Sequence, residues 1–158
     1  MIEFKPSDIV LVRGTGPIST GIEIVTNSPY SHVAGLVRPG ELIEANGFRK
    51  TGYQAVDCYD DQADVFRCDV ATDEQRDKIV EYVTKEVGEH YSYLLLTWEF
   101  VRYKTGIQPP FDPGPNRICS TLWANAYRKA GIDLCPGIKY PSPGDLGQSK
   151  LLRKIGSY

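Results

Sequence analysis

The chain has 158 residues, a common size for one domain, so the sequence predicts a single domain over residues 1–158. Hydrophobic residues make up 41% and charged residues 24%, which is ordinary for a globular protein. The formal net charge is −2, and acidic and basic residues are mixed along the chain. This charge pattern argues against a nucleic-acid-binding protein, because no basic stripe is available to neutralise phosphates.

The sequence has no apolar run that approaches the about 20 residues of a membrane-spanning helix, so stable membrane insertion is not expected. Residues 1–6 lack the basic segment and apolar run of a secretory signal peptide. As it stands, the sequence predicts a cytoplasmic protein, or one that is phage-encoded or delivered by a route that needs no such signal. We also expect a monomer.

The chain begins with strand-type and helical patterns in alternation. The apolar run 8–12 is typical of a strand, and apolar residues at helical spacing after Gly16 predict a short helix that ends near residues 27–29. Residues 31–37 and 42–45 are then predicted to form a hairpin.

Two more strand-type runs follow, at 51–56 and 63–70, and the polar segment 57–62 separates them. Cys58 and Cys68 flank this turn and are candidates to face each other across a second hairpin. The four cysteines are Cys58, Cys68, Cys119 and Cys135. They form no Cys-x-x-Cys pair and no zinc-finger spacing with the histidines, and without a signal peptide we expect reduced thiols rather than disulfides.

Helical patterns dominate the second half. Thr72 and Gln75 form a capping-box signature, and an apolar stripe predicts a helix that ends at Gly88. Further helices are predicted over 92–103 and 118–130.

The segments between and after these helices are rich in proline and glycine. Residues 105–116 contain four prolines and two glycines, which predicts a loop long enough to be functional. The tail 136–149 precedes a short apolar pair, Leu151 and Leu152, for which no element is predicted. Strands in the first half and helices in the second predict an α+β fold with an antiparallel sheet.

Cys119 stands where the proline-rich loop ends and the last predicted helix begins. A thiol in the first turn of a helix meets unpaired backbone N–H groups and the positive end of the helix dipole, and both favour the reactive thiolate. The same N–H groups can hold an oxyanion. Cys119 is therefore a candidate nucleophile, although its position alone equally fits a buried structural cysteine.

The chain has two histidines, His32 and His90. His32 lies at the entrance to an apolar strand, where the sheet would hold it in a constant direction, as general-base catalysis requires. His90 follows a predicted helix end and is typical of a surface residue. His32 is therefore the candidate base.

Glu44 lies between apolar residues on the strand predicted to pair with the His32 strand, and a carboxylate there needs a partner. If it accepts a ring N–H of His32, it fixes the tautomer and stabilises the imidazolium. Asn46 is the alternative orienting group.

The register of the hairpin decides whether the pair can meet. A simple two-residue turn at residues 39–40 puts His32 and Glu44 on opposite faces of the sheet. A loop one residue longer or shorter, or a bulge, puts both on one face, and in the register that pairs Leu36 with Leu42 Glu44 lies diagonal to His32. We therefore predict that the turn is not a simple two-residue type.

Three short motifs follow one another along the chain, with the histidine first and the cysteine last: Ser-His-Val at 31–33, Ile-Glu-Ala at 43–45, and Cys-Ser-x-Leu at 119–122. They resemble the circularly permuted branch of the NlpC-type papain-like amidases, the YiiX-like group, which is related in layout to the lecithin retinol acyltransferase family. Gly-x-x-Tyr at 88–91 and Ser-Pro-x-Asp-Leu at 142–146 also resemble that group. The long 105–116 loop is a departure from it.

The resemblance implies a permuted papain-like (NlpC-like) fold and a Cys-His-Glu triad of Cys119, His32 and Glu44. It also implies that Tyr91 contributes to the oxyanion hole or positions the cysteine, although a core tyrosine fits that position equally well. Ser120, next to the nucleophile, is expected in the same oxyanion or positioning role.

The expected activity is a cysteine hydrolase, an amidase or peptidase that works through a thioester and needs no cofactor or metal. The expected substrate is a small peptide, a cell-wall fragment such as a peptidoglycan stem peptide, or a lipid-like acyl compound. A lipid or ester acyl hydrolase or acyltransferase of the same fold, and a non-catalytic binding module, remain the alternatives.

Overall fold

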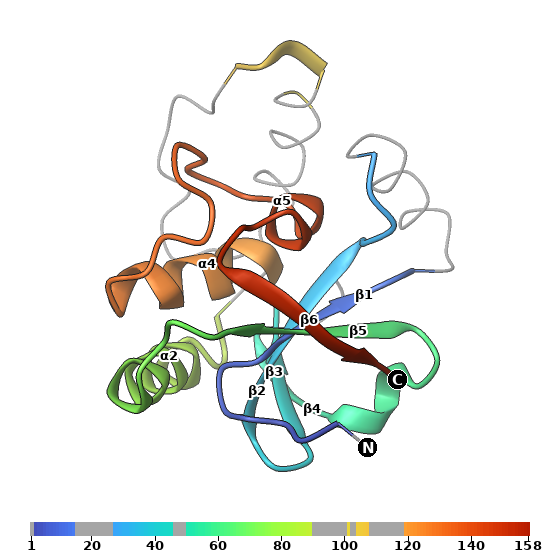
Figure 1. Cartoon of the computed structure of the whole chain (residues 1–158), viewed down its shortest axis with the longest axis vertical. Coiled ribbons are helices and arrows are strands. Elements are labelled where there is room, and N and C mark those ends of the chain that lie inside the picture. Colours follow the sequence, from blue (N-terminus) through green and yellow to red (C-terminus); the bar gives the residue numbers. More distant parts are fainter. Residues whose placement is uncertain (1, 15–26, 46–49, 90–100, 102–103, 108–118) are drawn as a thin grey trace.

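Six strands form one antiparallel sheet in the order β4-β3-β2-β1-β5-β6 (Figure 1). The computed structural model describes residues 2–14, 27–45, 50–89, 101, 104–107 and 119–158. The strands are β1 (Ile9–Val12), β2 (His32–Arg38), β3 (Glu41–Glu44), β4 (Gly52–Ala55), β5 (Ala63–Cys68) and β6 (Leu152–Ser157). The helices are the 3-10 helix η1 (Val56–Tyr59), α2 (Asp73–Lys85), α4 (Cys119–Lys129) and α5 (Pro143–Gly147). The predicted α+β class with an antiparallel sheet is confirmed.

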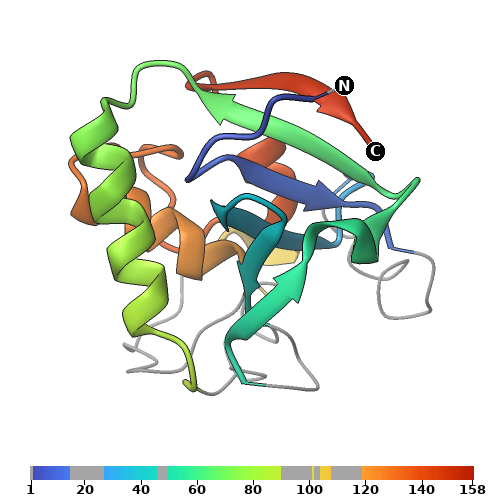
Figure 2. The same ribbon diagram turned by 90° about the horizontal axis from the view of Figure 1, so that it is seen from below.

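Alternate residues of each strand point to opposite faces of the sheet, and each face carries its own apolar cluster. On one face, which we call the helix face, strand residues such as Leu11 and Val33 pack with residues of α2, α4 and α5. Figure 2 shows α2 and α4 on the same side of the sheet. The other face carries a smaller apolar cluster, called here the opposite-face cluster. It consists of Val10, Val12, Ala34, Leu36, Leu42 and Ala63, with Phe4, Val56, Tyr59 and Tyr158 packed against it.

A buried charged group, the Asp8 cluster, holds the start of β1 against the helices. The Asp8 carboxylate is fully buried and accepts hydrogen bonds from Arg67 Nε at 2.9 Å and Nη2 at 2.6 Å. Arg76 Nη1 of α2 lies 3.8 Å from the same carboxylate. The hydroxyl of Tyr127 in α4 donates to the carbonyl of Ser7 at 2.7 Å. These contacts join the sheet to α2 and α4.

Both helices with long apolar stripes begin and end close to where the sequence predicts. Thr72 caps α2, and the reciprocal hydrogen bonds with Gln75 complete the capping box. Gly88 follows the end of α2 with a φ of 97°, and Gly131 follows α4 with a φ of 89°, both in the left-handed region that glycine tolerates.

Several predicted elements lie outside the described residues. These are the short helix before residue 27 and most of the 105–116 loop. Of the predicted helix over 92–103, only Val101 is described; it is helical, as are Lys104 and Thr105. Among the described residues, no helix is long and apolar enough to cross a membrane.

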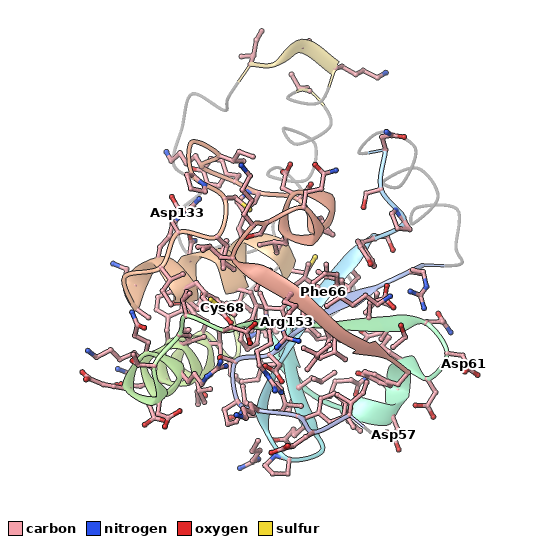
Figure 3. The ribbon with its side chains drawn as sticks, viewed as in Figure 1. Asp57, Asp61, Phe66, Cys68, Asp133 and Arg153 are labelled. Atoms are coloured by element: carbon pink, nitrogen blue, oxygen red, sulfur yellow. The ribbon has the colours of Figure 1, made fainter. Side chains whose placement is uncertain are left out.

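Two expectations about the strands are wrong. The tail beyond residue 149 forms β6, which pairs with β5, so strands are not confined to the first half of the chain. The 51–56 and 63–70 runs do not form a hairpin with each other, because β4 pairs with β3 whereas β5 pairs with β1 and β6. Figure 3 shows Asp57, the neighbour of Cys58, well separated from Cys68. All four cysteines lie among the described residues, and no disulfide joins any of them.

Candidate active site

The hairpin of β2 and β3 brings His32 and Glu44 together. Leu36 pairs with Leu42 and Arg38 with Glu41, so the strands are joined across Pro39 and Gly40 with a register shift at the intervening residue. The predicted pairing of Leu36 with Leu42 is confirmed. It arises from a bulge at Val37 and not from a longer turn, because the turn itself has only the two residues Pro39 and Gly40. Ala34 faces Glu44, and His32 therefore lies diagonal to it.

The two side chains make a direct contact in that register. Nε2 of His32 lies 2.7 Å from Oε2 of Glu44, within hydrogen-bond distance. The Glu44 side chain is 6% exposed and the His32 side chain 19% exposed, so little water competes for the pair. Asn46, the alternative partner, lies outside the described residues.

Cys119 is the first residue of α4, as the sequence predicts, and it is 5% exposed. One helical turn later, Trp123 anchors this helix on the hairpin: its Nε1 donates to the carbonyl of Ile43 at 3.0 Å. The Trp123 ring also lies against Gly35 of β2, where a Cβ would come within 2.3 Å of it. Only glycine allows this approach, and the cysteine helix is thereby fixed over the strands that carry His32 and Glu44.

The Glu44 carboxylate is within hydrogen-bond distance of the His32 ring, and the Cys119 side chain lies close enough to the ring to affect the pKa of His32. Burial of the ring disfavours its charged form, but the charges and hydrogen bonds of Cys119 and Glu44 outweigh this and raise the pKa of His32 from 6.5 to about 10. The imidazole therefore holds its proton at neutral pH between a thiol and a carboxylate.

Tyr59 of η1 is a member of this group that the sequence does not predict. Its hydroxyl donates a hydrogen bond to Oε2 of Glu44. Its ring centroid lies 5.9 Å from that of His32. Tyr59 belongs to the polar segment 57–62, which resembles an ordinary turn, and no periodicity or motif marks it.

Of the other candidate residues, Ser120 is described by the structure, whereas Tyr91 and His90 are not. Ser120 is fully buried, and its hydroxyl has no hydrogen-bond partner among the described residues. Its oxyanion or positioning role stays a prediction.

Within the described ranges, no group of three or more His, Cys, Asp or Glu side chains is arranged to hold a metal ion. His32 instead contacts Glu44 through Nε2 and lies near Cys119. The described donors therefore do not fit a metal centre.

Comparison with known proteins identifies the fold. No protein-family model and no curated protein matches the sequence. A solved structure described as the crystal structure of metalloprotein yiiX from Escherichia coli O157:H7 is similar to the chain, with 17% sequence identity and a TM-score of 0.72. The alignment covers 98% of this chain and 97% of that chain. The chain therefore has a YiiX-like fold over nearly its whole length.

Proposed function

We propose that the chain is a cysteine hydrolase, an amidase or peptidase, with Cys119 as nucleophile, His32 as acid and base, and Glu44 as the group that orients His32. One observation carries the proposal: Nε2 of the His32 ring lies 2.7 Å from the Glu44 carboxylate, and Cys119 lies close enough to the same ring to raise the pKa of His32. A nucleophile, a base and an orienting group in this sequence of contacts are the parts that covalent acyl transfer requires.

In the acylation step, the Cys119 thiolate attacks the carbonyl carbon of an amide and forms a carbon–sulfur bond. The negative charge that develops on the carbonyl oxygen is stabilised by backbone N–H groups at the start of α4. His32 then gives its proton to the leaving nitrogen as the carbon–nitrogen bond breaks. The products of this step are a free amine and a thioester on Cys119.

Deacylation uses the same residues in the reverse proton role. His32, now neutral, removes a proton from a water molecule that attacks the thioester carbonyl. The carbon–sulfur bond breaks, a carboxylic acid leaves, and the thiolate and imidazolium are restored. Glu44 keeps its charge throughout, because its task is to hold the ring and stabilise the imidazolium.

The layout of the site fits a permuted papain-like enzyme, which we propose as the family. The base and its orienting carboxylate come early in the chain, on β2 and β3, and the nucleophile comes late, on α4. The fold that the chain shares with the YiiX structure supports this assignment at the level of architecture. We propose a peptide amide as substrate, with a peptidoglycan stem-peptide bond as the first candidate and a lipid-like ester as the second.

The YiiX structure is described as that of a metalloprotein. Among the described residues of this chain, no three His, Cys, Asp or Glu side chains are grouped so that they could hold a metal ion, and the proposed mechanism has no step at a metal. Hydrolysis is therefore expected to continue unchanged after treatment with a chelator.

Thiol reactivity tests the nucleophile before any substrate is known. Burial and the nearby negative charge of Glu44 raise the pKa of the Cys58 thiol to about 11, and burial raises the pKa of the Cys68 thiol. With limiting iodoacetamide near neutral pH, peptide mass spectrometry should find Cys119 alkylated first. Labelling of Cys119 no faster than the other three cysteines contradicts the proposal.

The substrate test is an acyl adduct. The wild-type protein is incubated with candidate peptide amides and lipid esters, quenched in acid, and analysed for a mass increase on the Cys119 peptide. The size of the increase identifies the acyl group. A binding module with no catalytic activity gives no adduct with any candidate, and neither does the Cys119→Ala control.

A further inference from the structure

Tyr59 touches both polar residues of the hairpin site. Its hydroxyl donates to Oε2 of Glu44, which is the same oxygen that lies 2.7 Å from Nε2 of His32. Its ring is tilted by 50° against the His32 ring, with centroids 5.9 Å apart. One side chain from a separate element therefore contacts both the carboxylate and the base.

The backbone of η1 determines where the Tyr59 ring enters. The N–H of Val56, at the start of η1, donates to the carbonyl of Gly40 in the hairpin turn at 3.0 Å. At the other end, the N–H of Gln62 donates to the carbonyl of Tyr59 at 2.9 Å. The ring itself packs on the opposite-face cluster. The hairpin turn and η1 are thus joined, and the tyrosine is presented to Glu44 as part of that unit.

Glu44 needs such a donor. The residue is 5% exposed, so water contributes little to stabilising its negative charge. Burial and the negative charge of Glu44 raise the pKa of the Tyr59 phenol far above its usual value, so the hydroxyl keeps its proton and remains a donor at every working pH. A hydrogen bond to a carboxylate is among the stronger kinds, because one partner is charged.

We propose that Tyr59 is a positioning residue of this site: its hydroxyl holds the Glu44 carboxylate ionised and directed at His32, and so keeps His32 directed at Cys119. The inference rests on the proposed function of the three residues. It adds a fourth residue, from an element that the sequence motifs do not include.

The test compares two variants, each of which removes only the hydroxyl of one tyrosine. Tyr59→Phe keeps the ring and removes the donor to Glu44. Tyr158→Phe is the matched control, because Tyr158 packs on the same opposite-face cluster and its buried hydroxyl has no hydrogen-bond partner among the described residues. The readout is the rate at which iodoacetamide alkylates Cys119 near neutral pH, measured by peptide mass spectrometry.

We expect Y59F to lower this rate about tenfold, the size expected for a hydrogen bond to a charged group. Y158F should alkylate at the wild-type rate. Y59F should also lower the pKa of His32, followed by NMR of its ring protons, toward the value in Glu44→Gln. A Y59F protein with wild-type alkylation and wild-type His32 titration overturns the inference.

A double substitution separates positioning from general support of the fold. If Tyr59 acts through Glu44, Y59F causes no further loss in the E44Q protein. An equal fractional loss in both backgrounds means that the hydroxyl acts elsewhere, and the inference fails. Phenylalanine preserves the ring packing, and circular dichroism checks the fold. If Y59F does not fold, Tyr59→His is used in its place. The Cys119 alkylation rate of Tyr59→His must then be closer to the wild-type rate than that of E44Q is.

Because alkylation needs no substrate, the two proposals can fail separately. If the wild type forms no acyl adduct but the alkylation pattern holds, the proposed hydrolase is wrong and the role of Tyr59 in holding the His32–Glu44 pair stands. If the wild type forms the adduct and Y59F alkylates as the wild type does, the hydrolase stands and the role of Tyr59 is wrong.

Discussion

The two buried carboxylates Asp8 and Glu44 differ in the groups that pair with them. Asp8 is held by two guanidinium groups, Arg67 and Arg76, which keep their charge at any pH. Glu44 is held by His32, whose proton can move, and by the neutral hydroxyl of Tyr59. Both carboxylates are nearly inaccessible to water, but only the second has a partner able to exchange a proton.

Within one sheet, one buried carboxylate is therefore paired with fixed charges, and the other is paired with a group that can exchange a proton. The Asp8 cluster joins β1 to β5 and α2, and its charges are fixed. The Glu44 group lies where β2 and β3 meet the start of α4, next to a thiol. Groups with perturbed pKa values gather at functional sites, and the raised pKa of His32 fits the reaction proposed for the Glu44 group.

The largest expected effect comes from the nucleophile and base. Cys119→Ala should lose about 10⁴-fold or more in kcat, and His32→Ala nearly as much, because the two residues act as a unit. Their double variant should be no worse than either alone. Steady-state hydrolysis of the substrate found by adduct analysis measures this, with Cys135→Ala as a control that retains activity. A Cys119→Ala protein that still turns over refutes the thioester route.

Glu44→Gln should lower kcat by about 10² to 10⁴, because the amide cannot stabilise the imidazolium and can present the wrong group to the ring. Unfolding by urea should change little by comparison. Asn46→Ala should remain near wild type. The opposite outcome, with a nearly normal Glu44→Gln and a crippled Asn46→Ala, would assign the orienting role to Asn46.

Asp8→Asn should affect stability rather than turnover. It leaves Arg67 and Arg76 without their buried counter-charge, which costs about 3–5 kcal/mol in the free energy of unfolding. Urea denaturation followed by circular dichroism measures the loss, and kcat per folded molecule should be unchanged. If Asp8→Asn lowered kcat per folded molecule as well as the free energy of unfolding, the distinction between the two carboxylates would be wrong.

The smallest effect is a shift in pH dependence. His32 titrates at about 10 because Cys119 and Glu44 outweigh the burial that disfavours its charge. We expect kcat/KM to fall as pH rises through that value, when the leaving group loses its proton donor. In Glu44→Gln the pKa of His32 is lower, so the fall begins at a lower pH. Profiles that coincide in the two proteins contradict the pairing.

The same titration has a consequence for stability. The folded pKa of His32 lies above the ordinary value of 6.5, so the native state binds more protons than the unfolded state between these two values. The contribution of His32 to the free energy of unfolding is fully present below pH 6.5 and is lost as pH rises through about 10.

Much of the architecture followed from local patterns. The capping box at Thr72 and Gln75 begins α2, and the amphipathic pattern before Gly131 predicts α4 within a residue at each end. Two alternating runs around Pro39 and Gly40 predict the hairpin. Strand β6 was missed because its residues 153–157 carry mainly polar or small side chains at the sheet edge, where burial leaves little periodic signal.

The sequence by itself determined the local elements and the residue types of the site: a cysteine at a helix start, a histidine at a strand start, and a carboxylate on the adjoining strand. Only the tertiary structure decided that Glu44 meets His32, because one extra residue between Leu36 and Arg38 sets which face each side chain occupies. It alone also brought Tyr59 to Glu44, since that contact depends on how η1 packs against the hairpin turn. Periodicity records which side of an element is buried, but contacts between distant elements depend on register and packing, which no single segment encodes.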